Sequence, residues 1–79
     1  MPARPLIAVT GANGFVGSWL CGYLSQQGLD VHGFVRETSD VARLRGIDIT
    51  LSKGNERELL QKLTFLKPDV VILADWNGV

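Results

Sequence analysis

The sequence has little cysteine, little proline and no excess of charge of either sign. Cys21 is the single cysteine, so no internal disulfide can form and a disulfide-stabilised secreted domain is excluded. Eight basic residues balance eight acidic ones without any run of like charge, which argues against a general nucleic-acid or membrane-surface binder. We therefore expect a cytoplasmic protein that binds no nucleic acid and no membrane.

Long apolar runs are also missing. The stretch LIAV, residues 6–9, is too short for the core of a signal peptide, and no segment approaches the roughly 18 apolar residues of a membrane span. The 79 residues are 46% hydrophobic, which is typical of one small globular unit. A chain of this size buries only about 60 to 65% of its unfolded surface, so we expect it to associate or to continue beyond residue 79.

Short apolar stretches alternate with segments of helical periodicity along the chain. We expect strands at residues 6–10, 30–36, 47–51 and 69–74, the first and last of them buried on both faces. We expect helices at residues 15–27, from an N-cap at Thr38 or Ser39 through Arg45, and from an N-cap at Asn55 to Pro68. This order predicts an α/β fold, β-α-β-α-β-α-β, with a parallel sheet of strand order 3-2-1-4.

Two of the expected helices carry an apolar stripe. In the first helix the stripe consists of Val16, Leu20, Tyr23 and Leu24. In the last helix it consists of Leu59, Leu63 and Leu66, after a possible capping box between Asn55 and Glu58. Cys21 and His32 are expected to be ordinary buried or strand residues without a chemical role.

Three glycines recur every third residue in VTGANGFVG, residues 9–17, where the first strand meets the first helix. Gly11 would allow a sharp turn, Gly14 would let a diphosphate approach the backbone, and Gly17 would let the helix pack close to the sheet. The free amides of Phe15 and Val16 would face the anion at the positive end of the helix dipole. With Asn13 from the same loop, these residues form the expected phosphate site.

A family resemblance is carried by this loop. VTGANGFVGSWL resembles the T-G-x-x-G-x-x-G opening of the extended short-chain dehydrogenases/reductases, which include sugar-nucleotide epimerases and dehydratases, and LKPDVVI resembles their fourth strand. The resemblance spans essentially the whole chain. It implies that residues 1–79 are the N-terminal part of a Rossmann-type domain that binds a nicotinamide dinucleotide. The whole enzyme would act on a small molecule, either a nucleotide sugar or, as the alternative, a small ketone.

The end of the second strand bears on the choice of cofactor. In nicotinamide folds this position presents an acid to the adenosine ribose or an arginine to a 2′-phosphate. Here Val35 and Arg36 occupy it, which favours NADP over NAD, and Thr38 and Ser39 could add hydroxyl donors. Glu37 argues against the preference for NADP, because its carboxylate could turn toward the ribose. Arg36 could also be an ordinary solvated surface residue.

The later part of the chain contains further candidate cofactor-binding residues and also departs from the family pattern. In the resembled family an aspartate commonly contacts the adenine amino group where this chain has Asn55, which could instead be a plain N-cap. Ala74 is expected beside the cofactor. Trp76 is expected either as a stacking surface or as a core residue, and no histidine follows the last strand as it often does in the family.

The catalytic pair that the resemblance implies is absent from these residues. Family members usually carry Tyr-x-x-x-Lys, whereas Tyr23 is the single tyrosine and Gln27 follows it at that spacing. We therefore expect no catalysis from this chain alone, and either a larger parent enzyme or a non-catalytic dinucleotide-sensing or scaffold module. A further alternative is that the fragment binds nothing. The apolar edge of the fourth strand predicts that the isolated fragment forms a homodimer through that edge or else is poorly folded.

Overall fold

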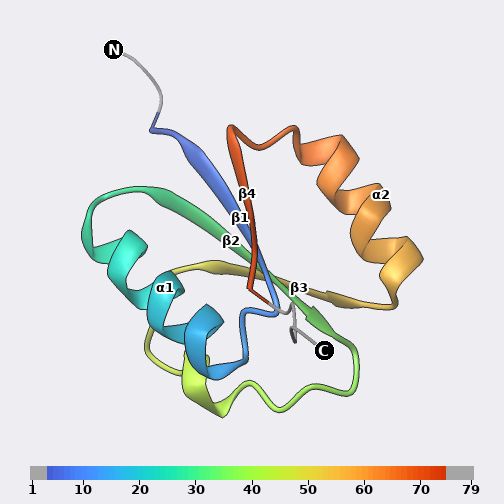
Figure 1. Cartoon of the computed structure of the whole chain (residues 1–79), viewed down its shortest axis with the longest axis horizontal. Helices are drawn as coiled ribbons and strands as arrows, with labels where there is room; N and C mark the ends of the chain where they lie inside the picture. The colour runs from blue at the N-terminus through green and yellow to red at the C-terminus, as the bar shows by residue number, and fades with distance from the viewer. Residues whose placement is uncertain (1–3, 75–79) are drawn as a thin grey trace.

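The computed structural model describes residues 4–74 as one four-stranded parallel sheet with helices on both faces (Figure 1). The strands are β1 (Leu6–Thr10), β2 (Asp30–Arg36), β3 (Thr50–Gly54) and β4 (Val70–Leu73). The helices are α1 (Phe15–Gln26), the 3-10 turn η1 (Ala42–Leu44) and α2 (Glu56–Leu66). The spatial order is β3-β2-β1-β4 with every pair parallel, so the predicted α/β topology is confirmed.

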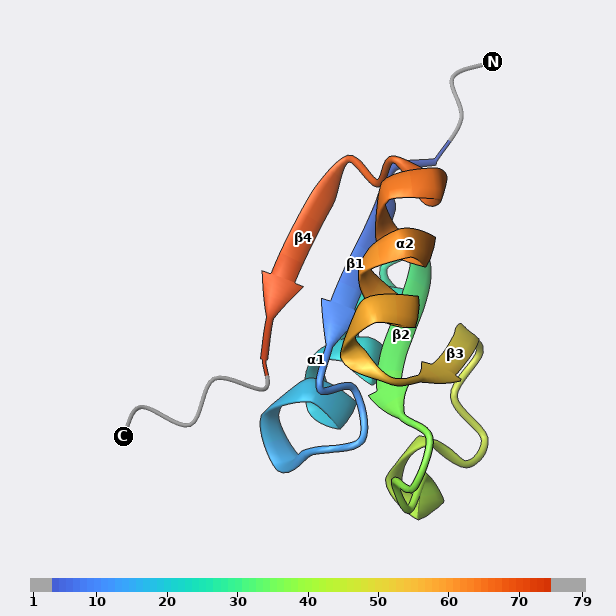
Figure 2. The same cartoon turned by 90° about the vertical axis from the view of Figure 1, so that its right-hand side faces the viewer.

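The two long helices lie on opposite faces of the sheet. Figures 1 and 2 show α1, which contacts η1, on one side and α2 on the other. This arrangement follows from the direction of the crossovers: β1 to β2 moves one way along the sheet, while β3 to β4 passes back over it. Because both connections are right-handed, they place their helices on opposite faces. The carboxyl ends of β1 and β2 are consequently framed by both helices.

The hydrophobic core lies around the two central strands. Ile7, Ala8 and Val9 of β1 are buried, as are the five residues from Val31 to Val35 of β2. Continuous apolar runs are typical of parallel strands that are covered on both faces, and the expectation for β1 is confirmed. The strand β2 also has the predicted bounds.

The core stripe predicted for α1 is partly wrong. The helix buries Gly17 and Cys21, whereas Val16 and Tyr23 are exposed. The cause is the close approach at Gly17, whose α-carbon lies against the backbone of Gly11 and Ala12. That contact sets the rotation of the helix about its axis, and hydrophobic periodicity alone does not reveal it.

The segment after β2 differs from the predicted helix. Only Ala42–Leu44 form a 3-10 turn, and the cap is neither Thr38 nor Ser39. The backbone N–H of Ala42 donates to Asp40 Oδ1 at 3.0 Å, while the N–H of Ser39 donates to the carbonyl of Arg36 at 3.0 Å. These local hydrogen bonds occupy backbone N–H and C=O groups that a longer helix would need. Short polar side chains such as Asp40 commonly compete with helix formation in this way.

The third strand is displaced toward the C-terminus from its predicted position at residues 47–51. Parallel pairing joins His32 to Thr50 and Arg36 to Gly54, so the strand contains the polar stretch TLSKG. Ile47 and Ile49, which suggested the earlier strand, instead pack against the core cluster. The apolar pattern therefore correctly predicted that these residues pack against the core, but it wrongly predicted where the strand begins and ends.

The last strand is less buried than predicted. Val70, Val71 and Leu73 are exposed and only Ile72 is half-buried. The strand β4 pairs with β1 alone and forms an edge of the sheet. The predicted stripe of α2 does face inward, but Leu59, Leu63 and Leu66 are only half-buried. This face of the sheet is therefore loosely covered.

Candidate functional site

The glycine turn joins β1 to α1 in a conformation that requires glycine at its first position. Gly11 has φ of 63°, the left-handed region that side-chain-bearing residues seldom adopt. Its carbonyl accepts the N–H of Gly14 at 3.0 Å, which closes the turn. The N–H of Ala12 donates to the carbonyl of Phe34 at 3.3 Å and ties the turn to the end of β2. The first of the three predicted glycine roles thus has a direct conformational cause.

Gly17 and Gly14 differ in what an added side chain would meet. A Cβ at Gly17 would collide with the carbonyl oxygen of Gly11 and lie 2.9 Å from its carbonyl carbon. A Cβ at Gly14 would meet only the same oxygen, at 3.4 Å, which is an ordinary contact. Gly17 is therefore required by the packing of α1 onto the turn. Gly14 is not required by packing, and it is the N-cap residue of α1.

The N-terminus of α1 has no side-chain cap. Gly14 is the N-cap residue, and the first helical hydrogen bond runs from the N–H of Ser18 to its carbonyl at 2.9 Å. The amides of Phe15 and Val16 precede that bond and have no partner within the helix. In contrast, α2 begins with a capping box between Asn55 and Glu58. The open end of α1 is suited to an anion.

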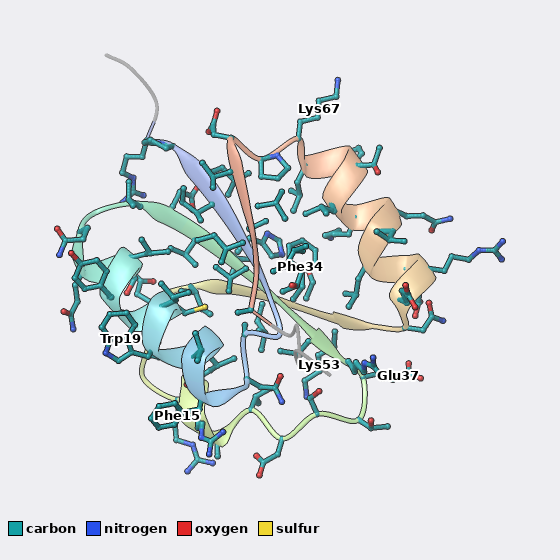
Figure 3. All side chains as sticks on the ribbon, viewed as in Figure 1. Phe15, Trp19, Phe34, Glu37, Lys53 and Lys67 are labelled. Carbon is teal, nitrogen blue, oxygen red and sulfur yellow. The ribbon has the colours of Figure 1, made fainter. Side chains whose placement is uncertain are left out.

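A pocket of about 500 Å³ lies at the carboxyl ends of β1 and β2, between the sheet and α2. Four predicted site residues line it, namely Gly11, Asn13, Arg36 and Ser39. The others on its wall were not predicted: Thr10, Phe34, Val35, Glu56, Leu59, Leu60, Leu63 and Leu73. Figure 3 shows Phe34 between the sheet and α2. The pocket thus combines an apolar interior with polar groups at its mouth.

The remaining predicted residues lie outside the wall of this pocket. They are Gly14, Phe15, Val16, Gly17, Thr38, Asn55 and Ala74. The side chains of Phe15 and Val16 are exposed, and the predicted contact is through their backbone amides. The backbone N–H of Ala74 donates to the carbonyl of Thr10 at 3.2 Å, which keeps Ala74 at the carboxyl end of β1. Trp76 lies outside the described residues.

Asn55 acts as the N-cap that one of its two interpretations predicts. Its Oδ1 accepts the N–H of Glu58 at 2.8 Å, and Glu58 Oε1 accepts the N–H of Asn55 at 2.9 Å. Both halves of the predicted capping box are therefore present. The adjacent Glu56 lines the pocket although Asn55 does not. The signal that could have found Glu56 is its position at the start of the helix that follows β3.

Two titratable side chains are buried and have shifted pKa values. Burial raises the pKa of the Cys21 thiol to about 11, so this thiol stays protonated and unreactive at neutral pH. Burial and the charge of Lys62 lower the pKa of His32, and Asp30 opposes them. The ring of His32 stacks on Phe34 and its Nε2 lies 2.7 Å from Ser52 Oγ. Both side chains are buried, as predicted.

His32 makes stability depend on pH. Its pKa in the folded state lies below the ordinary value of 6.5, so the unfolded chain binds the proton more readily. The stabilising contribution of neutral His32 is complete above about pH 6.5 and is lost as the pH falls below it. We expect the urea concentration at the midpoint of unfolding to fall as the pH is lowered from 6.5 to 5. The fall should be smaller in the His32→Gln variant. An equal decline in that variant would assign the effect to other groups.

These features define a class of protein. A parallel sheet of order 3-2-1-4 with a glycine turn into an uncapped helix is the dinucleotide-binding arrangement of the Rossmann type. The sequence model of the NAD dependent epimerase/dehydratase family matches residues 7–77. The chain belongs to this family, whose members bind a nicotinamide dinucleotide. A search of the curated proteins finds no match.

Two other kinds of site are not found in the part of the chain that the structure describes. No helix within residues 4–74 has both the length and the apolar character needed to cross a bilayer. The same residues contain no cluster of three or more His, Cys, Asp or Glu side chains that could hold a metal ion. The glycine turn and its pocket are the candidate site.

Proposed function

We propose that residues 1–79 form the N-terminal, NADP-binding part of an epimerase, dehydratase or reductase that acts on a nucleotide sugar. The observation that carries the proposal is the contrast between Gly14 and Gly17. Bare backbone at Gly17 serves the packing of α1, but bare backbone at Gly14 has no packing reason and lies at an uncapped helix end. An approaching diphosphate accounts for both features.

The preference for NADP rests on the end of β2. Arg36 lines the pocket at the position where an acid would grip a free ribose diol, and Ser39 lines it nearby. The guanidinium offers several donors in a fixed fork that matches a phosphate. Glu37 is exposed and is not part of the pocket wall (Figure 3). This placement favours Arg36 over Glu37 as the residue that meets the ribose. Thr38, which is exposed beside them, is proposed as a further hydroxyl donor.

The adenine is proposed to lie against the apolar part of the pocket. Leu59 and Leu63 of α2 supply that wall, and Glu56 stands at its entrance. The Oδ1 atom of Asn55 already accepts one hydrogen bond within the capping box, and its second lone pair remains for an adenine amino group. Ala74, held beside Thr10, is the proposed neighbour of the cofactor on β4.

The residues assigned to the site bind and orient the cofactor. Bound nicotinamide dinucleotide would provide hydride transfer at a carbinol carbon of the substrate. Tyr23, the single tyrosine of the sequence, stacks on Trp19 at the outer side of α1 and is not part of the pocket wall. A tyrosine and lysine for proton transfer are therefore proposed to come from further residues of the whole protein. A non-catalytic dinucleotide-sensing module is the alternative that their absence from these 79 residues favours.

Titration calorimetry with NADPH and NADH tests the function. We expect NADPH to bind more tightly, because a charge-assisted hydrogen bond to the 2′-phosphate contributes about 1.5 to 3 kcal/mol. Arg36→Ala should therefore weaken NADPH binding about ten- to hundredfold while NADH binding stays the same. Absence of heat with either cofactor would contradict dinucleotide binding by this chain. If Arg36→Ala bound NADPH as tightly as the wild type does, Arg36 would not be a cofactor-binding residue.

A further inference from the structure

The loop between β2 and η1, residues 37–41, carries part of the pocket wall. Ser39 of this loop lines the pocket, as does Arg36, the last residue of β2. The two residues are held differently. Arg36 pairs with Gly54 of β3 and so has a fixed place in the sheet, whereas Ser39 belongs to no helix or strand. The position of Ser39 in the pocket therefore depends on what holds the loop.

The side chain of Asn13 joins this loop to the glycine turn. Its Nδ2 donates to the backbone carbonyl of Asp40, 27 residues away in the sequence, at 3.4 Å. Asp40 directly follows Ser39, and its carboxylate Oδ1 accepts the N–H of Ala42 at 3.0 Å. Because Asn13 binds a backbone group, the contact constrains the path of the loop. We call this hydrogen bond the Asn13 tether.

Both ends of the loop are anchored, so the Asn13 tether acts on the part between them. At the first end, the N–H of Ser39 donates to the carbonyl of Arg36 at 3.0 Å and closes a turn after β2. At the other end, Leu44 of η1 is buried in the core. The guanidinium carbon of Arg43 lies 5.9 Å from the centre of the Phe15 ring, a cation–π distance. The loop is thus held along its length against the start of α1.

We propose that Asn13 is a positioning residue, which through the Asn13 tether holds Ser39 where the 2′-phosphate of NADP binds. This inference rests on the proposed function, because it takes the 2′-phosphate to lie at Arg36 and Ser39. A loop that is ordered in advance loses less conformational entropy when its ligand binds. NAD has no phosphate at this position, so its binding gains less from an ordered Ser39. The glycine turn then contributes to the choice between NADP and NAD through one side chain.

The competing role for Asn13 is direct contact with the diphosphate. Asn13 is half-buried and lines the same pocket, and an amide that donates one N–H to Asp40 has a second N–H left. The two roles predict different results. Both cofactors carry the diphosphate, so loss of a direct contact would weaken NADPH and NADH binding alike. Loss of the Asn13 tether would weaken NADPH binding alone.

Titration calorimetry of the 79-residue chain with NADPH and NADH tests the proposal. Asn13→Ala should weaken NADPH binding about two- to tenfold, the usual effect of one neutral hydrogen bond, and leave NADH binding unchanged. Gln27→Ala removes an exposed amide at the far end of α1 and should change neither affinity. Equal weakening for both cofactors, or no weakening, would overturn the positioning role and leave the proposed function standing. A wild-type chain that binds neither cofactor, or binds both equally, would overturn the two together.

The Asn13→Ala variant is expected to fold. Among residues 4–74, Lys67 is the one residue other than glycine with a positive φ, so alanine fits the backbone at position 13. The Tm should change by no more than about 4 °C, as for an ordinary surface substitution. An unfolded fraction would lower the apparent affinities for NADPH and NADH by the same factor. The ratio of the two affinities therefore tests the proposal even if the variant is less stable.

A double-mutant cycle with Ser39→Ala separates positioning from direct contact with the 2′-phosphate. Ser39→Ala removes the hydroxyl that the Asn13 tether positions. Adding Asn13→Ala to that variant should therefore weaken NADPH binding much less than it does in the wild type. If Asn13→Ala had its full effect in both backgrounds, the amide would contact the phosphate itself, and the positioning role would be wrong.

Discussion

Gly17→Ala is expected to destabilise the folded chain severely, although alanine is the better helix former. The new methyl group would collide with the carbonyl of Gly11 and lie 3.0 Å from the α-carbon of Ala12. Neither neighbour is a flexible side chain, so α1 must move away from the turn. Overpacking of this kind costs about 1 to 3 kcal/mol or more, against about 4 to 12 kcal/mol of total stability for a chain of this length. A fall in Tm of about 10 °C or more should be seen by circular dichroism.

Gly22→Ala is the matched control for that prediction. It makes the same substitution in the same helix, but its methyl group meets only Ile47 Cδ1 at an ordinary distance. The gain in helix propensity, up to about 1 kcal/mol, should then appear as a higher Tm. If Gly17→Ala and Gly22→Ala shifted Tm in the same direction, the close approach of α1 to the turn would not be the reason for glycine at position 17.

Much of the fold could be predicted because its signals are local. A continuous apolar run located β1, the bulky residues Val31, Phe34 and Val35 located β2, and the capping box at Asn55 located the start of α2. Parallel order followed from the alternation of strands and helices with short connections. The glycine turn was equally readable, since Gly11 requires a positive φ that few other residues tolerate.

What could not be predicted depends on contacts between distant parts of the chain. The rotation of α1 is set by Gly17 against Gly11, so periodicity wrongly assigned Tyr23 to the core. The bounds of β3 are set by pairing with β2, which takes in the polar residues Ser52 and Lys53. Such tertiary pairing overrides local propensity, and β propensity depends strongly on context.

The candidate site was predicted in its backbone and only partly in its side chains. Gly11 and Arg36 meet at one pocket because the carboxyl ends of adjacent parallel strands lie at the same edge of the sheet. Glu56 and Leu60 enter that pocket from α2, whose position over the sheet has no signature in the local sequence. Residues contributed by a crossover helix are therefore the part of such a site that sequence reasoning misses.

Gly14→Ala is expected to fold and yet to lose the cofactor. Gly14 has φ of −76° and ψ of 175°, which alanine adopts freely, and its Cβ would lie 3.4 Å from the carbonyl oxygen of Gly11. Stability should fall by no more than about 1 kcal/mol, the usual loss when alanine replaces a favourable N-cap residue. Under the proposed function, however, the methyl group stands where the diphosphate approaches the free amides of α1.

The expected loss of affinity is large because charged hydrogen bonds are involved. Two bonds from the backbone to the diphosphate contribute about 3 to 6 kcal/mol, so NADPH binding by Gly14→Ala should weaken roughly 100- to 10,000-fold. Titration calorimetry measures the loss, and Gly22→Ala should bind as the wild type does. Undiminished NADPH affinity in a folded Gly14→Ala protein would place the diphosphate elsewhere. Glycine at position 14 would then be explained by its place as the N-cap residue of α1 alone.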